Sequence, residues 1–533
     1  MSHRMIDTTT VSPISRTRFE RLRTSLSVVA APIALLVLGS ASTWLYFWGR
    51  DLHRFTQWIA AYIGLFVGQL ALYALAWYAV QRWSAGSSRV AKWMTIALVI
   101  IFAAAYRGVL VPQRPYLSSD VYRYVWDGRV QAAGMNPYRY VPEAPELVDL
   151  RDGTIYPNVN REDRSWLSPY PPVAQIIFFA VARIRPLNVT AFKAAISSFD
   201  LITVLLLMLV LARSGLDPAR AIIFAWHPLS VFESAHSGHI EAVYITFLVL
   251  ALFAWSKRRS FLTGASLGLA TMVKLYPALL LPVFIVATRQ GMNDDRTWPD
   301  SSVVARFSQS IRGLLHKSNI MILAAFVVTI VVAYAPYLSA GGNMFAFLRG
   351  YVEEEGFVNN GARYFLLEAF RKVVPIPTDM FLVVAAVFLV AVAVWWLLRV
   401  KLDARDVGRG AIALIGTYLM LTTPRYAWYY VWLIPFLCFA PRLGWLYLSS
   451  AATLLYLVWY TPLVYPGIPF WLGAAIFGLA MAMLAWDLLG ERYRASPADR
   501  DRAAYSTVKS ISCLIVAFLS FFLTASFIVN SSV

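Results

Sequence analysis

Eighteen apolar residues follow one another without a break in Phe381-Leu-Val-Val-Ala-Ala-Val-Phe-Leu-Val-Ala-Val-Ala-Val-Trp-Trp-Leu-Leu398. A helix of about 20 such residues is long enough to cross the hydrocarbon core of a membrane. Similar blocks run from Ala30 to Trp48 and from Met321 to Leu338. A soluble protein with many buried helices would show polar faces between its apolar stripes, and these blocks have none. The sequence therefore predicts an all-α polytopic membrane protein.

The composition agrees with a lipid environment. Hydrophobic residues make up 59% of the 533 residues and charged residues only 14%, whereas a soluble domain carries about 25% charged residues. Both cysteines, Cys438 and Cys513, lie in apolar runs, which indicates neither a disulfide framework nor a zinc site. The net charge of +18 comes from short basic clusters between apolar blocks, a pattern typical of cytoplasmic loops. The lipid bilayer is an expected partner, and nucleic acid is not.

The basic clusters also predict an orientation. The first apolar block is preceded by Arg16, Arg18, Arg21 and Arg23, which place the N-terminus in the cytoplasm. The block ends in bulky aromatic residues rather than a cleavage site, so it is expected to be retained. Spans at 28–48, 57–81 and 93–111 then leave the loop Pro112–Pro171 outside. This loop holds eight acids and seven bases and lacks a positive bias.

One short segment decides the count of spans. Four apolar stretches lie between that loop and the basic cluster Lys257–Arg259, and four full crossings would leave the cluster outside. Pro172–Ile184 is too short to span a membrane. If this segment does not cross, the basic cluster lies in the cytoplasm, as the positive-inside rule requires. The whole chain is then expected to have about 15 transmembrane helices, the last near residues 510–529.

The external loop contains a predicted helix between Ser118 and Gly134. Ser118 or Ser119 would cap its start and Gly134 its end. Tyr122, Tyr124, Val125 and Trp126 give it an aromatic side, which suits a juxtamembrane helix at the membrane interface.

Two carboxylates lie on one stripe of this helix. Asp120 and Asp127 are about 10 Å apart along the axis, too far for the close carboxylate pair of a retaining glycosidase. A single general base fits better, and Asp120 lies in the first turn, where the helix dipole favours the ionised form. Alternatively, Asp120 only caps the helix and Asp127 only pairs with Arg123 or Arg129.

A second polar constellation follows His227-Pro228 and includes Glu233, His236, Ser237, Gly238, His239 and Glu241. Polar residues this dense between apolar spans line a cavity or pair with one another. His236 and His239 have no third metal ligand at a characteristic spacing, so we expect hydrogen bonding to a sugar or phosphate, and neither a metal nor another cofactor. A satisfied structural network is the alternative.

Three cations are candidates for binding an anion. Lys274 interrupts a long apolar run, and Arg363 and Arg425 lie among aromatic residues in outer loops. An isolated intramembrane lysine is expected to pair with an anion such as a lipid phosphate. Snorkelling to the head groups, or anchoring at the interface, is the alternative for each.

These segments together resemble the GT-C integral-membrane glycosyltransferases, in particular bacterial mannosyltransferases of glycosyltransferase family 87. The resemblance covers roughly residues 90–440. It is carried by Ser119-Asp120 with Tyr122 and Tyr124, Gly134–Tyr138, Tyr170–Pro172, His227–Leu229, Ser237–His239, Lys274–Pro277, Pro424–Tyr426 and Trp428-Tyr429.

The resemblance implies inverting transfer of a hexose, here expected to be mannose, from a polyprenyl-phosphate sugar to a hydroxyl of a glycan or glycolipid acceptor. It implies that Asp120 is the general base, with Asp127 as a competing acid. Lys274, Arg425 and Arg363 would hold the donor phosphate. Contacts to the substrates are expected from Tyr124, His236, His239, Tyr170 and Tyr426.

The same resemblance divides the chain. Residues 1–92 would be a cytoplasmic N-terminus with two extra transmembrane helices, and 93–338 a GT-C-like catalytic module with the first external loop at 112–171. A second external loop (339–377) and C-terminal transmembrane helices (378–533) follow. The expected location is the cytoplasmic membrane, with the active site external or periplasmic. The alternatives are a transporter or lipid flippase, whose charges would lie near mid-membrane, and an outer-face polysaccharide polymerase or ligase.

Overall fold

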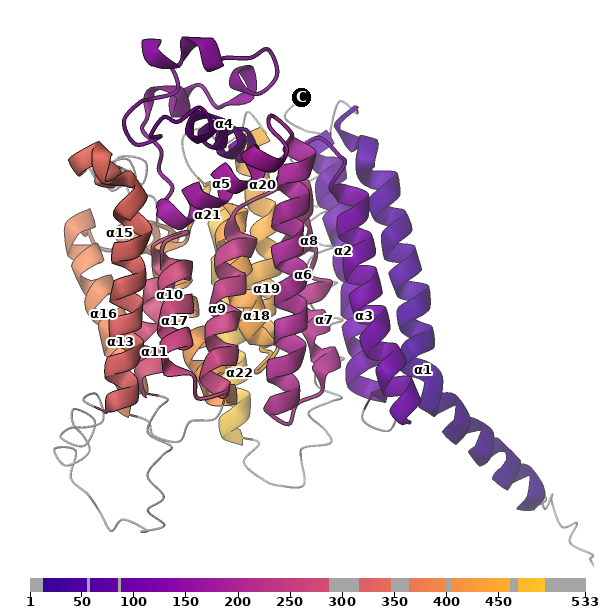
Figure 1. Cartoon of the computed structure of the whole chain (residues 1–533). Helices are drawn as coiled ribbons and strands as arrows, with labels where there is room; N and C mark the ends of the chain where they lie inside the picture. Colours follow the sequence, from indigo (N-terminus) through magenta and orange to yellow (C-terminus); the bar gives the residue numbers. More distant parts are fainter. Residues whose placement is uncertain are drawn as a thin grey trace, which may run out of the picture.

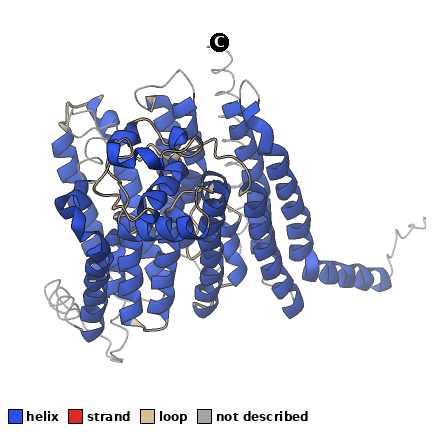
Figure 2. Ribbon diagram, turned by 45° about the horizontal axis from the view of Figure 1, so that its top comes forward, coloured by secondary structure: helices blue, strands red, loops and turns tan. Residues whose placement is uncertain are grey.

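The computed structural model describes residues 13–54, 58–84, 88–286, 316–346, 364–398, 404–460 and 468–493. These residues form a bundle of helices with a helical cap across one end (Figure 1). They contain no β-strand, in agreement with the apolar blocks of the sequence (Figure 2).

The α-helices are α1 (Pro13–Trp48), α2 (Trp58–Trp83), α3 (Arg89–Leu110), α4 (Asp120–Ala132), α5 (Pro172–Ile184), α6 (Val189–Arg213), α7 (Ile222–Ala225), α8 (Pro228–Val231), α9 (Glu241–Ser256), α10 (Ser260–Thr271), α11 (Leu281–Val286), α13 (Lys317–Tyr334), α15 (Phe365–Arg371), α16 (Thr378–Leu398), α17 (Ala404–Thr422), α18 (Ile434–Leu437), α19 (Leu443–Ala451), α20 (Tyr456–Tyr460), α21 (Phe470–Gly473) and α22 (Leu479–Tyr493). The π-helical segments are η6 (Phe232–Ser237) and η13 (Ala474–Gly478), and the 3₁₀ segments are η1 (Gly49–Arg54), η2 (Pro145–Leu150), η3 (Tyr156–Asn158), η4 (Glu162–Ser165), η5 (Pro218–Ala221), η7 (Tyr276–Leu280), η9 (Ala335–Phe345), η11 (Ala427–Leu433) and η12 (Ala452–Leu455).

Seven helices in the described ranges are long and apolar enough to cross a membrane. They include α1, α2 and α3, which match the first three predicted spans, and α6 and α16. Shorter apolar helices such as Glu241–Ser256 lie among them. The total of about 15 spans stays a prediction, because the last predicted span lies outside the described residues.

The helices α9, α10 and α13 pack side by side, and two glycines bring α10 and α13 into close contact. A Cβ atom on Gly264 would lie 2.1 Å from the carbonyl oxygen of Ile322, and one on Gly268 would lie 2.9 Å from Cβ of Thr329. The two glycines are four positions apart, so they lie on one face of α10. This small-residue spacing lets helix backbones approach closely in membranes.

The cap consists of α4, α5 and the loop around them. α5 is thirteen residues long and lies across the end of the bundle beneath α4 (Figure 1). The backbone N–H groups of Val173 and Ala174, at its start, donate to the carbonyl oxygen of Met272 at 2.9 and 3.3 Å. This arrangement agrees with the non-crossing segment predicted for Pro172–Ile184.

The aromatic side of α4 was expected to lie at the membrane interface, and this prediction is wrong. Tyr122, Tyr124, Val125 and Trp126 are all buried in the protein. Trp126, for example, packs on Tyr156 of the covering loop, with ring centroids 5.1 Å apart. The sequence pattern correctly indicated an apolar face, but that face packs against α5 and the loop rather than against the bilayer.

Candidate active site

Local hydrogen bonds fix the position of Asp120 as the first residue of α4. The Ser118 hydroxyl accepts a hydrogen bond from the backbone N–H of Asp120 at 3.2 Å. At the other end, Gly134 has a positive φ of 81°, and the N–H of Met135 donates to the carbonyl of Val130 at 3.1 Å. This is the Schellman arrangement that glycine favours at a helix C-terminus. The predicted helix and its glycine terminator are therefore confirmed.

The carboxylate of Asp127 is fully engaged inside the cap. Its Oδ1 accepts from Arg123 Nε at 2.8 Å. Its Oδ2 accepts from the Ser168 hydroxyl at 2.5 Å and from Gln175 Nε2 at 2.9 Å. Only 2% of Asp127 is exposed. These contacts are those of a structural carboxylate that ties α4 to α5 and to the end of the loop.

A bent segment between α6 and α9 carries the second polar constellation. It runs through α7, α8 and the π-helix η6, and it turns at Gly238, where φ is 73°. A Cβ atom there would lie 2.8 Å from Lys193 Cγ and 3.2 Å from Val121 Cγ2. Glycine thus meets two requirements, a left-handed backbone and close contact with the first turn of α4. The turn brings His239 to the start of α4.

The imidazole of His239 lies among three carboxylates. Its Nδ1 is 3.6 Å from Asp120 Oδ2 and 3.9 Å from Glu241 Oε2, and its Nε2 is 3.5 Å from Glu233 Oε2. The side chains of His239, Glu233 and Glu241 are at most 1% exposed, whereas that of Asp120 is 29% exposed. Solvent therefore reaches this cluster at Asp120.

Lys274 joins the cluster through Glu241. Its Nζ forms an ion pair with Glu241 Oε1 and lies 4.9 Å from the centre of the Tyr429 ring. The lysine is 5% exposed, so it does not snorkel into open solvent. A protein carboxylate is thus one partner of the anion-binding candidate. An ammonium group has three donors, which leaves room for a second anion.

The segment that begins at Arg425 covers one face of the His239 ring. Trp428 stacks on His239 with ring centroids 4.1 Å apart, and Tyr426 stacks on Trp428 at 4.6 Å. The guanidinium of Arg425 lies 5.3 Å from the centre of the Tyr426 ring. Asp120, His239, Lys274, Arg425 and Tyr426 therefore gather from four distant parts of the chain.

The other substrate-binding candidates lie at different depths. Tyr124 is fully buried, and burial raises the pKa of its hydroxyl well above the usual value, with further contributions from Asp120 and Glu241. It therefore stays a hydrogen-bond donor beside the carboxylate cluster. Tyr170 packs edge-on against Tyr124 at 4.9 Å. His236 points instead toward Tyr62, whose hydroxyl is 3.3 Å from His236 Nε2.

Two sequence predictions remain, one about Arg363 and one about metal binding. Arg363 lies outside the described residues. Within the described ranges, no group of three or more His, Cys, Asp or Glu side chains is placed to hold a metal ion.

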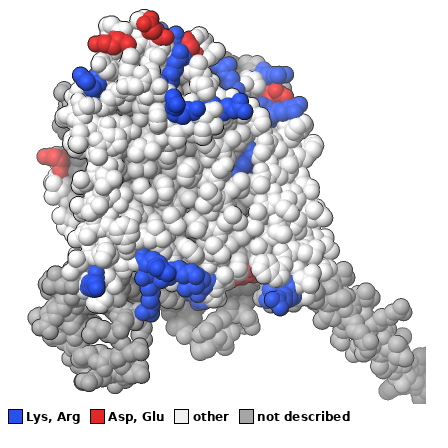
Figure 3. Space-filling view, in the orientation of Figure 1, with Lys and Arg blue, Asp and Glu red and all other residues white. Residues whose placement is uncertain are grey.

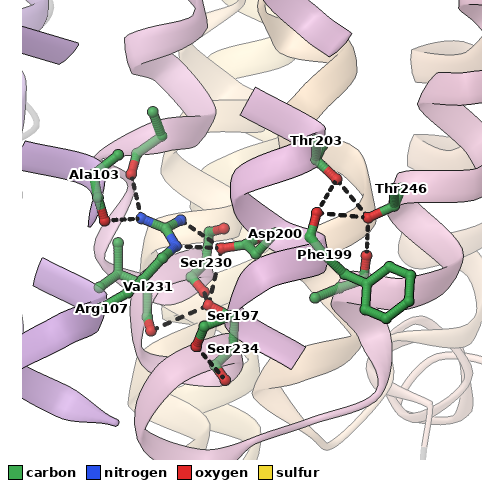
Figure 4. A network of polar contacts seen from close by, with 12 residues as sticks. Ala103, Arg107, Ser197, Phe199, Asp200, Thr203, Ser230, Val231, Ser234 and Thr246 are labelled. Atoms are coloured by element: carbon green, nitrogen blue, oxygen red, sulfur yellow. Dashed lines mark hydrogen bonds and ion pairs between the residues drawn. The ribbon is translucent and has the colours of Figure 1, made fainter. Parts of the chain in front are cut away.

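A buried ion pair between α3 and α6 was missed in the sequence. Arg107 donates to Asp200 Oδ2 through Nε at 2.7 Å and to the carbonyl of Ala225 through NH1 at 3.0 Å. The Ser234 hydroxyl donates to the same Asp200 oxygen at 2.9 Å (Figure 4). The pair thus supports the π-helix that carries Glu233. The sequence did contain a signal for this pair, because Arg107 and Asp200 are charged residues within two different apolar spans.

This pair also changes one argument about function. A transporter is expected to carry charged residues inside its membrane bundle, near mid-membrane. Arg107 and Asp200 are each 1% exposed within the bundle, so charge placement alone does not exclude transport.

Comparison with known proteins identifies the chemistry. Residues 23–290 match the family described as "Alpha-(1->6)-mannopyranosyltransferase, N-terminal domain", and residues 166–424 match glycosyltransferase family 87. No curated protein and no solved structure matches the chain. The first match covers half of the chain, including α4 and the bent segment. The described residues include seven helices that are long and apolar enough to cross a membrane. The chain therefore belongs to the alpha-(1->6)-mannopyranosyltransferase family and is a glycosyltransferase.

Proposed function

We propose that this protein transfers a mannosyl group from a polyprenyl-phosphate donor to a hydroxyl of a lipid-linked or cell-envelope glycan, with inversion at the anomeric carbon. The two family matches support the sugar and the reaction class. The main structural support for a catalytic carboxylate is the difference between the environments of the two carboxylates of α4. Asp120 is 29% exposed beside a buried polar cluster, whereas both oxygens of Asp127 are engaged by protein donors.

In this reaction Asp120 is the general base. The acceptor oxygen attacks C1 of the donor sugar, the bond between C1 and the phosphate oxygen breaks, and the acceptor proton passes to the Asp120 carboxylate. The bonding electron pair leaves with the polyprenyl phosphate, which departs as an anion and needs cations rather than an acid. Inversion to an α linkage requires a β-linked donor.

Lys274 and Arg425 are the cations proposed to hold the donor phosphate. Lys274 is fixed by Glu241 and lies over Tyr429, and Arg425 lies beside Tyr426. Aromatic faces next to a fixed cation suit a ligand that carries both a sugar ring and a phosphate. Arg363 remains a proposed third contact on the basis of the sequence alone.

The cap is proposed to face the outside of the cytoplasmic membrane. Charges lie mostly near the two ends of the visible face of the molecule, with both signs around the cap and mostly basic residues at the opposite end (Figure 3). Cytoplasmic loops are the ones enriched in Lys and Arg. Single cysteines at Glu146 and at Arg258, in a chain with Cys438 and Cys513 replaced by serine, test this orientation. A membrane-impermeant maleimide added to whole cells or spheroplasts should label only the former; labelling only at position 258 would reverse the orientation.

The assignment of the base is tested with Asp120→Asn. The purified variant, supplied with polyprenyl-phosphate mannose and a short α-(1→6)-mannoside acceptor, should lose about 100-fold or more in kcat. Asp152→Asn, a change in the same external loop but outside the cluster, serves as the matched control and should transfer at the wild-type rate. Transfer by Asp120→Asn at the wild-type rate would remove Asp120 from the mechanism.

A further inference from the structure

A second polar cluster lies where the N-terminal helices meet the segment that leads into α4. It combines His53 of η1, Tyr116 of the external loop and His236 of the π-helix η6. Tyr116 stacks on His53, with ring centroids 3.8 Å apart, and its hydroxyl lies 2.9 Å from His53 Nε2. The centroid of the His236 ring is 6.3 Å from that of Tyr116. Three segments that are far apart in the sequence therefore meet here.

Two imidazole nitrogens of this cluster are buried without a hydrogen-bond partner among the described residues. They are Nδ1 of His53 and Nδ1 of His236. His236 is 0% exposed, and its other nitrogen, Nε2, lies 3.3 Å from the Tyr62 hydroxyl. Buried polar atoms are nearly always paired, and exceptions call for a specific explanation. A ligand that carries hydroxyl groups would supply the missing partners, because a hydroxyl both donates and accepts and so pairs with either imidazole tautomer.

The cluster is accessible and suits a neutral ligand better than an anion. Tyr116 and His53 are only half-buried, so solvent reaches the cluster on their side. Three cations near the cluster already have partners in the protein. They are Arg54 with Asp51 at 3.2 Å, Arg114 with Asn158 Oδ1 at 3.2 Å, and Lys193 with the carbonyl oxygen of Leu110 at 3.2 Å. Aromatic rings with a few polar groups beside them are the usual lining of a small-molecule site.

The segments that build this cluster also build the candidate active site. Tyr116 precedes Asp120 by four residues, so their Cα atoms are at most about 14 Å apart. A short oligosaccharide can span that distance. His236 precedes His239 by three residues, and the π-helix thus supplies one histidine to each of two neighbouring places. A glycan bound at Asp120 can therefore extend to Tyr116.

The two substrates of the proposed reaction need different surroundings. The cations proposed to hold the donor phosphate, Lys274 and Arg425, lie against Tyr429 and Tyr426 of the C-terminal half. The second cluster is built from the N-terminal half of the chain. This division leaves the second cluster for the acceptor.

We propose that His53, Tyr116 and His236 form an acceptor subsite, which binds a mannosyl unit next to the one attacked at Asp120. This inference rests on the proposed transfer to a glycan hydroxyl. The aromatic ring would contact the apolar face of the sugar, and the imidazole nitrogens would bond to its hydroxyls. α1 and α2 pack side by side and reach the end of the bundle that carries the cap (Figure 1). Through η1, which joins them, these two helices supply part of the acceptor site.

Tyr116→Ala tests the subsite with acceptors of two lengths. The purified full-length enzyme receives polyprenyl-phosphate mannose and either methyl α-mannoside, which fills only the position at Asp120, or α-(1→6)-linked mannotriose. The wild-type kcat/KM should be at least about tenfold higher for the trisaccharide, and Tyr116→Ala should lose this preference through a higher KM for the trisaccharide. Its kcat/KM for methyl α-mannoside and its KM for the donor should stay within about twofold of the wild type.

Three results would overturn the subsite. The first is a wild-type enzyme that transfers to both acceptors without a length preference. The second is a Tyr116→Ala enzyme that keeps the whole preference. The third is an equal loss of kcat/KM for both acceptors, because a merely structural residue lowers both alike. A wild-type enzyme that transfers mannose to neither acceptor would refute the proposed function, and this inference with it.

Two further variants complete the test. His53→Ala leaves the segment before α4 unchanged and decides the matter if Tyr116→Ala does not fold. It should lose the same preference for the trisaccharide, and a retained preference would overturn the proposal. Tyr140→Ala changes another half-buried tyrosine of the same external loop and is the matched control. It should keep the wild-type length preference.

Discussion

Trp428 lies flat against His239, with ring centroids 4.1 Å apart. His239 follows the π-helix of the N-terminal half, and Trp428 belongs to η11, well beyond residue 290, where the first family match ends. The candidate site is therefore completed by the C-terminal half of the chain. A protein truncated after the matched N-terminal region would lack one wall of the cluster.

Replacing Trp428 with leucine should lower kcat about tenfold and leave the fold intact. The smaller side chain frees the imidazole beside Asp120 to rotate and so disturbs the surroundings of the proposed base. Misplacement of a catalytic group by about 1 Å costs up to about 100-fold. Trp428→Phe, which preserves an aromatic face, should retain most of the rate. Initial rates at saturating donor measure both. Equal rates for the leucine and phenylalanine variants would show that stacking has no role.

Asp127→Asn should destabilise the protein rather than remove the base. Its carboxylate pairs with buried Arg123, and breaking a buried ion pair costs about 3–5 kcal/mol. We expect a lower melting temperature in detergent, with activity retained at temperatures where the variant is folded. Asp120→Asn should do the reverse, with a near-normal melting temperature and no transfer. An Asp127→Asn protein that melts normally but is inactive would reassign the base.

Variants of the ion pair between Lys274 and Glu241 can distinguish a role of Lys274 in folding from a role in phosphate binding. Lys274→Met alone should destabilise the bundle, because it leaves a buried carboxylate without its cation. Lys274→Met combined with Glu241→Met removes both charges and should restore the melting temperature. Transfer should remain impaired in the double variant, with a KM for the polyprenyl-phosphate donor at least about tenfold higher. A normal KM would exclude Lys274 as a phosphate ligand.

Gly264→Leu should force α10 and α13 apart. Even a Cβ atom at this position would lie 2.1 Å from a carbonyl oxygen of α13. Overpacking of this kind costs about 1–3 kcal/mol or more. Ala265→Leu, on the neighbouring half-buried position of α10, is the matched control and should be tolerated. Melting temperatures in the same detergent compare the two. Equal values would mean that the helices separate without cost.

Much of the architecture could be predicted from the sequence because it depends on local patterns. Apolar length predicted α1, α2 and α3, the shortness of Pro172–Ile184 predicted α5, and Gly134 predicted the end of α4. The distinction between Asp120 and Asp127 could not be predicted. It depends on Ser168 and Gln175, which lie 41 and 48 residues beyond Asp127 and reach it only through the fold of the loop.

The contact between His239 and Asp120 was beyond sequence reasoning for a different reason. Both residues were candidates, but they were assigned to substrate binding and to base catalysis separately. Their proximity depends on the π-helix before Gly238 and on the left-handed turn at Gly238. Neither a π-helical segment nor a close contact with Val121 has a sequence signature that would have brought the two side chains together.

The buried pair of Arg107 and Asp200 has a consequence for biogenesis. The two residues are 93 positions apart, so the ribosome delivers the arginine to the translocon first. At about 5–20 residues per second, its partner follows roughly 5–20 s later. An unpaired arginine at a helix centre costs about 2.5–3.5 kcal/mol on translocon-insertion scales. Arg107 lies in the last turn of α3, so this value is an upper bound for it. Arg107 therefore lacks its carboxylate partner until α6 has been synthesised.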